Sequence, residues 1–306
     1  MLTRWNLGTV SVMLGLTACA HILGNRVMTP TPTTTNAPMG GYAPVNGLQL
    51  YYEIHGSGEP LILLHGAIGA IETAGDTLPA LAKHYRVIAV DLQAHGRTAD
   101  IDRPLLLELM ADDIATLIDY LGLGSANLMG YSLGGGVALQ TAIRHRDRVR
   151  SLVLVSVPFR KAGWYPEIQA DMEKMGPDAI EPLKQTPIYE LYSKIAPRPQ
   201  DFAVLLGKLG DLLRRDYDTS QQLAGLPPTL LVAGDSDSFS PAHAVEFFVR
   251  LGGGQRDGGW DGSSRPASQL AILPGTTHYD IFTSAALVPT VLPFLGSHTH
   301  AQSAAQ

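Results

Sequence analysis

The sequence is poor in several features that mark common classes of protein. Its 306 residues contain one cysteine, which excludes an internal disulfide and a cysteine-rich zinc or iron–sulfur site. No run of lysine or arginine occurs and the formal net charge is −6, so the basic surface that nucleic acids or anionic membranes require is lacking. P-loop and dinucleotide-binding glycine motifs are also missing, as is a His-x-x-x-His pair. We therefore expect no nucleic-acid partner, no metal and no cofactor.

The sequence does contain enough apolar material for one large core. Hydrophobic residues make up 45% of the chain and charged residues 16%, a balance typical of a folded domain rather than of a disordered segment. An α/β domain of about 250 residues fits this length as a single unit. We therefore expect one domain flanked by shorter segments of different composition.

The single cysteine lies at the end of an apolar N-terminal segment. Residues 1–18 begin with one positive charge and continue as an apolar stretch that is shorter than the roughly 20 residues needed to span a bilayer. Such a segment is typical of a secretory signal peptide. Residues 16–19, Leu-Thr-Ala-Cys, resemble the bacterial lipobox, which implies cleavage before Cys19 and lipidation of its thiol. We expect an exported bacterial cell-envelope protein anchored by this lipid, with a signal cleaved elsewhere or an uncleaved anchor as the alternatives.

A stretch rich in threonine and proline follows at residues 29–38, and two glycines come soon after it. Such a composition cannot pack a core and favours an extended, solvated chain. We therefore predict a tether over residues 19–44 and a folded domain that begins near Val45. The final residues, 297–306, are predicted to form a polar tail.

From residue 48 onward, short apolar runs alternate with helical patterns. Continuous apolar runs are typical of strands buried on both faces, and the clearest helix, 104–121, repeats leucine and isoleucine at three- and four-residue spacing. This alternation predicts an α/β fold: a mostly parallel, twisted sheet with helices on both faces, built from residues 45–158 and 226–296. The predicted strands are 48–55 (in an edge hairpin), 61–64, 87–91, 126–130, 152–156, 229–234 and 270–273.

The strongest motif stands at the carboxyl end of the predicted strand 126–130. Residues 130–134, Gly-Tyr-Ser-Leu-Gly, have the G-x-S-x-G pattern of a nucleophile elbow, in which a serine occupies a strained turn between a strand and a helix. Both flanking positions are glycine, as a turn without room for side chains requires. The helix that follows presents its N-terminal N–H groups to a developing oxyanion. We predict that Ser132 is a nucleophile.

A serine nucleophile needs a base, and the base needs an acid that orients it. Four further segments follow predicted strands: His65-Gly66, residues 91–96 (Asp-Leu-Gln-Ala-His-Gly), residues 234–237 (Gly-Asp-Ser-Asp) and residues 274–278 (Pro-Gly-Thr-Thr-His). Together with the elbow, these segments resemble the α/β-hydrolase family over roughly residues 48–295. In that family the triad runs serine, acid, histidine along the chain, which implies Ser132, Asp237 and His278. Asp235 is the alternative acid.

The resemblance also implies an oxyanion hole and a helical cap. The oxyanion is expected to be held by the backbone N–H groups of Leu133, directly after the nucleophile, and of Ala67. Residues 159–225 do not alternate strand and helix; they are predicted to form two or three helices, at the place where the family carries a cap over its triad. The many apolar and aromatic residues of this insert favour a small apolar or aromatic substrate.

The histidines are not equivalent in this interpretation. Only His278 follows the last predicted strand, as a triad base would. His65 and His95 match positions that are structural in the family. His243 lies in a helical pattern, where we expect it on the solvated surface. Ala94 departs from the family, which commonly has glycine there, and is expected to alter one wall of the pocket without touching the triad.

One further stretch stands out by its composition. Residues 252–268 are rich in glycine and polar residues and contain Trp260. They lie between the acid and base segments in the sequence, which would allow them to reach the rim of the site, but their residues indicate no specific role.

These observations predict a cofactor-independent serine hydrolase that acts on a carboxylic ester of a small apolar or aromatic compound through an acyl-enzyme. The same triad also serves cofactor-free perhydrolases or haloperoxidases and hydrolases of carbon–carbon bonds, and these alternatives stay open. A non-catalytic binding module on the same fold is a further alternative, although such proteins commonly lose a triad member and none is missing here. The sequence leaves the oligomeric state open.

Overall fold

The fold is seen in a computed structural model that describes residues 39–299. The predicted signal peptide, Cys19 and most of the predicted tether lie outside the described residues, as do residues 300–306. Within residues 39–299, no helix combines the length and the apolar character needed to cross a membrane.

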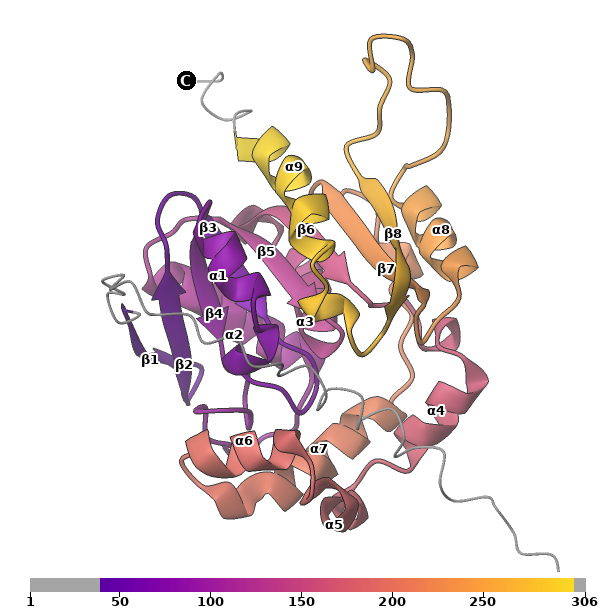
Figure 1. Ribbon diagram of the computed structural model, residues 1–306. Helices are drawn as coiled ribbons and strands as arrows, with labels where there is room; N and C mark the ends of the chain where they lie inside the picture. The colour runs from indigo at the N-terminus through magenta and orange to yellow at the C-terminus, as the bar shows by residue number, and fades with distance from the viewer. Residues whose placement is uncertain (1–38, 300–306) are drawn as a thin grey trace, which may run out of the picture. The chain divides into compact units, whose positions relative to one another are not determined.

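An eight-stranded sheet forms the centre of the domain, in the order β1-β2-β4-β3-β5-β6-β7-β8 (Figure 1). β1 and β2 run antiparallel to their neighbours, whereas all pairs from β4 to β8 are parallel. The predicted α/β class is confirmed, and each predicted strand coincides with an observed one. The strands are β1 (Met39–Val45), β2 (Leu48–His55), β3 (Pro60–Leu64), β4 (Arg86–Val90), β5 (Ala126–Tyr131), β6 (Val149–Val155), β7 (Thr229–Ser236) and β8 (Gln269–Thr277).

The folded domain begins earlier than the sequence predicted. β1 pairs along its whole length with β2, so the prediction that the tether extends to residue 44 was wrong for residues 39–44. An edge strand is held by main-chain hydrogen bonds and needs few apolar side chains, so its glycines and proline concealed it. The absence of a side chain at Gly40 is a requirement here, because a Cβ would lie 2.3 Å from the carbonyl oxygen of Tyr52.

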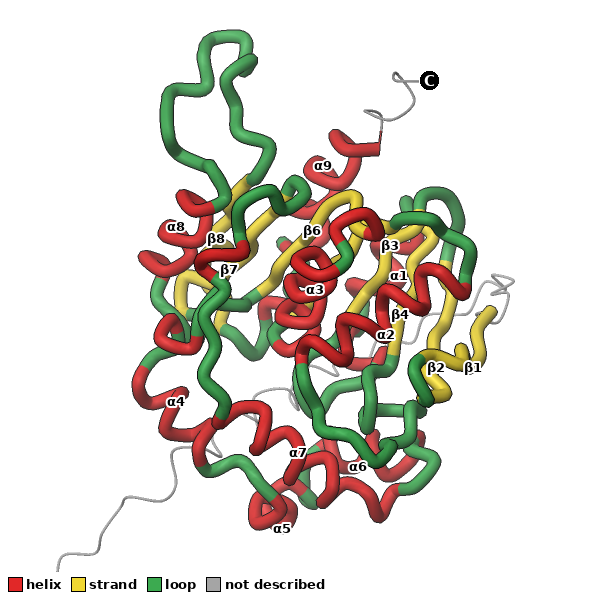
Figure 2. The backbone as a smooth tube through the Cα atoms, turned by 180° about the vertical axis from the view of Figure 1, so that it is seen from behind, coloured by secondary structure: helices red, strands yellow, loops and turns green. Residues whose placement is uncertain are grey.

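Helices cover both faces of the sheet (Figures 1 and 2). The continuous apolar run of β3 contributes side chains to both faces of the sheet. Leu61 and Leu63 pack in the cluster under α1 and α9. Ile62 and Leu64 pack in the cluster under α2, α3 and α8. α9 continues three residues into the predicted polar tail. These helices are α1 (Thr77–Ala82), α2 (Leu107–Tyr120), α3 (Leu133–Arg144), α8 (Pro241–Arg250) and α9 (Leu287–Thr299).

Residues 159–225, called the cap from here on, lie between β6 and β7 and form one group of helices (Figure 1). They contain four α-helices, not the two or three predicted, because α5 is a single turn too short to show a periodicity. α7 buries Phe202, Leu205, Leu206 and Leu209, at three- and four-residue spacing, in the same apolar cluster as α2 and α3. The helices are α4 (Pro166–Glu173), α5 (Ile180–Leu183), α6 (Pro187–Ile195) and α7 (Phe202–Arg214).

Candidate active site

The parallel strands of the sheet end at a common edge, which we call the carboxyl edge; the opposite edge is the amino edge. Ser132 directly follows β5, Asp237 directly follows β7 and His278 directly follows β8. Ligand sites of open α/β sheets lie at such a carboxyl edge, because the loops that leave the parallel strands converge there. The topology therefore brings together three residues that the sequence separates by up to 146 positions.

Ser132 occupies the strained turn that the elbow motif predicts. Its backbone has φ 52° and ψ −115°, in a region that favours glycine, and α3 begins at the next residue. The turn leaves no room on either side: a Cβ on Gly130 would lie 2.2 Å from the carbonyl oxygen of Gly134, and one on Gly134 would lie 2.5 Å from that of His65. Gly130 thus allows α3 to approach the end of β5, and Gly134 allows it to approach the end of β3.

The three side chains form one chain of hydrogen bonds. Ser132 Oγ lies 3.0 Å from His278 Nε2, and His278 Nδ1 lies 3.0 Å from Asp237 Oδ1. Since a carboxylate only accepts, the Nδ1 proton of a neutral imidazole points to Asp237, which leaves the Nε2 lone pair to accept the serine proton. This is the tautomer in which a histidine acts as a general base toward a hydroxyl.

Asp237 is held by more donors than His278 alone. Its carboxylate accepts hydrogen bonds from the N–H groups of Gly234 at 3.0 Å and Ser238 at 2.7 Å, and from the hydroxyl of Ser156. Burial by itself disfavours the charged form, but the hydrogen bond and charge of His278, with those from Ser156 and Gly234, outweigh it and lower the pKa of Asp237. The carboxyl is therefore ionised at neutral pH beside the imidazole.

The structure separates the two candidate acids. The side chain of Asp237 is fully buried against His278, whereas Asp235 is exposed and accepts a hydrogen bond from the Gly275 N–H at 3.0 Å. Asp235 thus ties the end of β7 to the last residues of β8, just before the histidine. Of the two aspartates, only Asp237 contacts His278, and Asp235 has a structural role.

Two backbone N–H groups flank the serine at the positions expected for an oxyanion hole. Ser132 N donates to Val155 O and Gly134 N donates to His65 O, but no hydrogen bond within residues 39–299 uses the N–H of Leu133 or Ala67. The loop after β3 passes directly beside the nucleophile, since a Cβ on Gly66 would lie 3.5 Å from Ser132 Cβ. Both predicted donors therefore remain available to a ligand on this edge.

Three side chains that the sequence interpretation missed support the histidine and the acid. Ser156, with φ 52°, donates its hydroxyl proton to Asp237. The Tyr131 hydroxyl donates to the backbone carbonyl of His278 at 2.6 Å and fixes the loop that carries it. Trp164 of the cap lies edge-on to the His278 ring, with 5.5 Å between the ring centroids. Only Ser156 had a sequence signal, because it ends a predicted strand at the carboxyl edge.

His65 and His95 are buried and hold loops in place. His65 Nδ1 donates to Gly66 O at 2.7 Å while its Nε2 accepts from Leu92 N at 3.1 Å, which links the loops after β3 and β4. Burial lowers the pKa of His65 to about 4 and that of His95 to about 3, so both are neutral at pH 7. Ala94 in the same region has φ +65°, which explains why glycine suits this position.

The expectation that His243 lies on the solvated surface was wrong. It is buried at the start of α8 and stacks on Phe159 with 4.4 Å between ring centroids. A Cβ on Gly163 of the cap would lie 2.5 Å from His243 Nε2, so the cap packs directly on this ring. Burial lowers the pKa of His243 to about 4. A helical pattern indicates which face is apolar but cannot show that a polar ring is covered by a distant segment.

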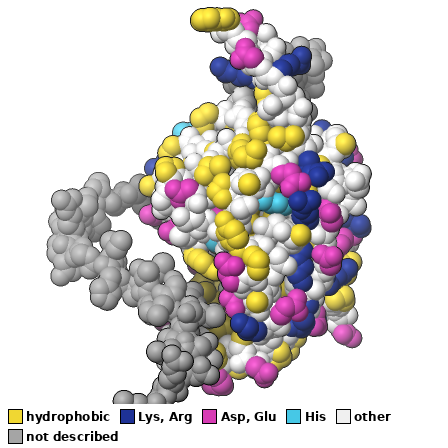
Figure 3. Space-filling view, turned by 90° about the vertical axis from the view of Figure 1, so that its right-hand side faces the viewer, with side chains coloured by type: hydrophobic (Ala, Val, Ile, Leu, Met, Phe, Trp, Pro, Cys, Tyr) yellow, Lys and Arg dark blue, Asp and Glu magenta, His cyan; other side chains and the backbone are white. Residues whose placement is uncertain are grey.

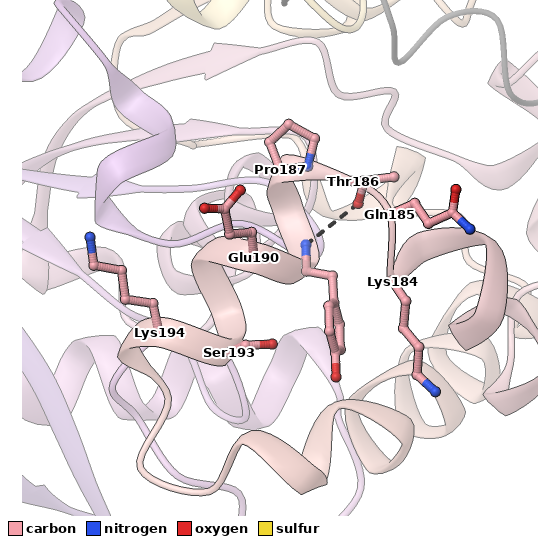
Figure 4. Close-up of a pocket in the computed structure, with 8 residues that line it drawn as sticks. Lys184, Gln185, Thr186, Pro187, Glu190, Ser193 and Lys194 are labelled. Carbon is pink, nitrogen blue, oxygen red and sulfur yellow. Dashed lines mark hydrogen bonds between the residues drawn. The ribbon is translucent and has the colours of Figure 1, made fainter.

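Two other regions lie apart from the triad. Residues 252–268 lead into the amino end of β8 and so lie at the amino edge, which contradicts the expectation that they could reach the rim of the site. A cavity of about 640 Å³ lies on the α5–α6 part of the cap and is lined by Thr186, Tyr189 and Ser193 among others, none from the triad (Figure 4). In residues 39–299, no group of three His, Cys, Asp or Glu side chains is arranged to hold a metal ion.

Known proteins resemble this chain in both sequence and fold. A family model described as the α/β-hydrolase fold matches residues 59–185. The putative carbamate hydrolase RutD of Azorhizobium caulinodans is 29% identical over 220 residues, which cover 66% of this chain and 82% of that protein. The 2-hydroxy-6-oxo-6-(2'-aminophenyl)hexa-2,4-dienoic acid hydrolase of Metapseudomonas resinovorans is 32% identical over 130 residues, 41% of this chain and 43% of that protein.

A solved structure extends the likeness to most of the chain. A thermophilic esterase from Thermogutta terrifontis matches with a TM-score of 0.63 and 24% identity, over 86% of this chain and 99% of that one. Apart from the Azorhizobium caulinodans protein, seven curated relatives, a second RutD among them, are matched over only 31–43% of their own length. The shared fold, the family match and the hydrolases among the relatives agree with one another. This chain has the α/β-hydrolase fold, and the hydrolases and esterases among its matches support an enzyme.

Proposed function

We propose that this enzyme is a serine hydrolase that cleaves a carboxylic ester of a small apolar or aromatic compound through a Ser132–His278–Asp237 triad. The observation that carries the proposal is the unbroken hydrogen-bond chain from the Ser132 hydroxyl through the imidazole to a buried carboxylate. A free serine hydroxyl is a weak nucleophile near pH 7, and this arrangement supplies the base that activates it.

In the first half-reaction, Ser132 Oγ attacks the acyl carbonyl carbon while His278 Nε2 takes the hydroxyl proton. The carbonyl oxygen becomes an oxyanion, which accepts hydrogen bonds from the free N–H groups of Ala67, in the loop after β3, and of Leu133, at the amino end of α3. The imidazolium, stabilised by Asp237, then gives its proton to the leaving alcohol, and the acyl group stays on the serine oxygen.

In the second half-reaction, water attacks the acyl-enzyme in the same way. His278 takes a proton from the water, the tetrahedral intermediate again places its oxyanion on the two N–H groups, and its collapse returns the proton to Ser132. The products are the free acid and the alcohol, and the enzyme returns to its starting state. No redox group is needed at any step.

The cap supports an apolar or aromatic substrate. Trp164 lies against the triad histidine and belongs to a small apolar cluster with Phe239, against which the half-buried Ile168 and Met172 of α4 pack. Sites for small molecules are mostly apolar with a few polar groups that fix orientation, and this wall beside the triad has that character.

Hydrolysis of a carbon–carbon bond next to a ketone is the second candidate. The Metapseudomonas relative is named for a 2-hydroxy-6-oxo dienoic acid, a keto compound whose name contains no ester. The RutD relative is named for a third substrate class, as a putative carbamate hydrolase. The triad and oxyanion donors would be the same, so the substrate distinguishes the candidates and the fold does not.

A fluorophosphonate probe combined with p-nitrophenyl esters of graded chain length tests the proposal. We expect labelling of the wild-type chain, none of Ser132→Ala, and turnover of short or aromatic esters. Labelling without turnover of any ester would favour the carbon–carbon alternative, to be tried with a vinylogous 1,5-diketone. An equally labelled Ser132→Ala variant would contradict the assignment of the nucleophile.

We also propose that the enzyme is exported in a bacterium and anchored in the cell envelope by a lipid on Cys19. The support is the resemblance of residues 16–19 to a lipobox and the position of the chain's single cysteine. Labelled palmitate should enter the wild-type chain and not Cys19→Ser. Equal labelling of the two would contradict the anchor.

A further inference from the structure

The connection from α8 to β8, residues 252–268, extends away from the rest of the domain (Figures 1 and 2). We call it the α8–β8 loop. Both of its ends are fixed: a Cβ on Gly253 would lie 2.1 Å from the Phe248 ring, and Ser268 Oγ accepts a hydrogen bond from Thr229 N at 3.3 Å. Since the loop enters the amino end of β8, it lies on the edge opposite to the triad.

The tip of this loop is a defined turn that presents Trp260. The side chain is completely exposed, at 109% of its reference area. Two main-chain hydrogen bonds of 3.1 Å close the turn around it, from Ser264 N to Gly258 O and from Gly262 N to Gly259 O. The indole is therefore held out by a preformed backbone, which reduces the entropy lost when it binds something.

Trp260 is the only large apolar side chain of the α8–β8 loop. Around it are glycines and serines, and the two arginines, Arg256 and Arg265, balance the two aspartates, Asp257 and Asp261. Figure 3 shows a hydrophobic group alone at the end of the projecting part, with acidic and basic side chains below it. The loop thus combines one amphipathic ring with no net charge.

The size of this surface argues against a protein partner. A stable protein interface buries about 800 Å² on each side, whereas one aromatic side chain supplies at most about 250 Å². Binding at the interfacial zone of a lipid bilayer requires less buried area. A single indole can bury its apolar body there while its N–H stays among the polar headgroups.

A second membrane contact would matter for a chain anchored at Cys19. Nineteen residues lie between Cys19 and Met39, and a chain of that length reaches up to about 70 Å when extended. A domain of about 260 residues has a radius of gyration of only about 18 Å, so such a tether alone would let any face of the domain meet the bilayer. A contact at the amino edge would select one orientation.

We propose that the α8–β8 loop inserts Trp260 into the interface of a phospholipid bilayer and so turns the carboxyl edge, with its triad, away from the membrane. One indole binds weakly and reversibly, so the loop orients a domain that is already held nearby and does not replace the anchor. Because the loop carries no net charge, the binding does not require anionic lipids and is insensitive to salt.

The test uses the chain from residue 19 with Cys19→Ser, which has no lipid and keeps all of the described residues 39–299. It contains two tryptophans, and the other, Trp164, is buried and hydrogen-bonded to Tyr217. With phosphatidylcholine vesicles we expect a blue shift of the emission and quenching by lipids brominated on their acyl chains. The partition coefficient, measured by co-sedimentation, should fall at least tenfold in Trp260→Ala.

The matched control is Tyr120→Ala, which removes an exposed aromatic ring from the end of α2 and should leave partition unchanged. Ser132→Ala should also bind vesicles like its parent, which separates this test from that of the hydrolase activity. The proposal is overturned by an unchanged emission spectrum, by equal partition of Trp260→Ala, or by binding that disappears when salt is raised. Self-association abolished by Trp260→Ala would instead assign the indole to a second copy of the chain.

Discussion

The two edges of the sheet use different residues where the backbone must turn into a left-handed conformation. At the amino edge, in the connections that lead into β3, β5, β7 and β8, every described residue with positive φ is a glycine. At the carboxyl edge, non-glycine residues also adopt it, and all such residues in the range 39–299 lie there. They are Asn46, Ile68, Ala94, Ser132 and Ser156.

At Ser132 and Ser156 this difference marks turns that present a side chain to the site. A left-handed conformation costs a residue with a Cβ roughly 1–2 kcal/mol, so it persists only where the surrounding structure enforces it. Ser132 and Ser156 require it because their hydroxyls must meet His278 and Asp237. A glycine would relieve the strain at either position and would remove the hydroxyl.

The largest effect is expected at the most constrained residue of the carboxyl edge. Ser132→Ala should lower kcat for a p-nitrophenyl ester by about 10⁶-fold, because no other group in the site replaces the nucleophile. The matched change at the amino edge, Ser125→Ala, removes a hydroxyl that accepts from Arg150 and should keep near wild-type turnover. A Ser132→Ala variant with a tenth of wild-type kcat would refute the triad.

The next effect distinguishes two acids that leave the same strand. Asp237→Asn should lower kcat by about 10⁴-fold, because an amide at this position no longer secures the required imidazole tautomer. Asp235→Asn keeps an oxygen that can accept from Gly275 N and should cost less than about tenfold. The kcat values of the two variants, measured by steady-state kinetics at one pH, show which aspartate acts on His278. Equal losses in the two variants would mean that the loop they share, and not the contact with His278, sets the activity.

A smaller effect concerns stability in acid. The pKa of His243 is about 4 in the folded chain and about 6.5 when unfolded, so the unfolded state binds more protons between these values. Stability from this group is present above pH 6.5 and is lost as the pH falls toward 4, by about 3 kcal/mol in total. Between pH 7 and pH 4, the free energy of unfolding should therefore fall by about 3 kcal/mol less in His243→Phe than in the wild type. Urea unfolding at the two pH values measures this difference.

The control for this prediction is His84→Phe, because His84 is exposed in the connection that enters β4 at the amino edge. Its pH dependence of stability should match that of the wild type. If His243→Phe retained the full acid sensitivity, the neutral buried ring would not be its source, and His65 and His95 would be the next residues to replace.

The smallest effects test the backbone comparison itself. Gly225 has φ +77° with open space where a Cβ would stand, so Gly225→Ala should cost about 1 kcal/mol through backbone strain alone. Ala94→Gly should relieve strain at φ +65° but gains unfolded-state entropy, for a net stabilisation of about 0.5 kcal/mol. Thermal unfolding should show a drop of roughly 3 °C and a rise of roughly 1–2 °C. Shifts of the same sign would contradict the comparison.

The features that could be predicted from the sequence are those that short-range physics determines. The buried strands show as continuous apolar runs because both faces of the sheet are covered, and the elbow shows because its turn excludes side chains at Gly130 and Gly134. The edge strand β1 was missed since main-chain pairing, which any residue supplies, holds it in place. The four-residue helix α5 was missed because one turn has no periodicity.

The sequence by itself determined the class of fold and offered a serine, two aspartates and a histidine in a suggestive order. Only the tertiary structure decided that Asp237 and not Asp235 meets His278, that Ser156 and Trp164 support the pair, and that His243 is covered. These contacts join segments that the sequence separates by dozens of residues. Their energies depend on how strands and cap pack, and that packing is a property of the whole chain rather than of any local stretch of it.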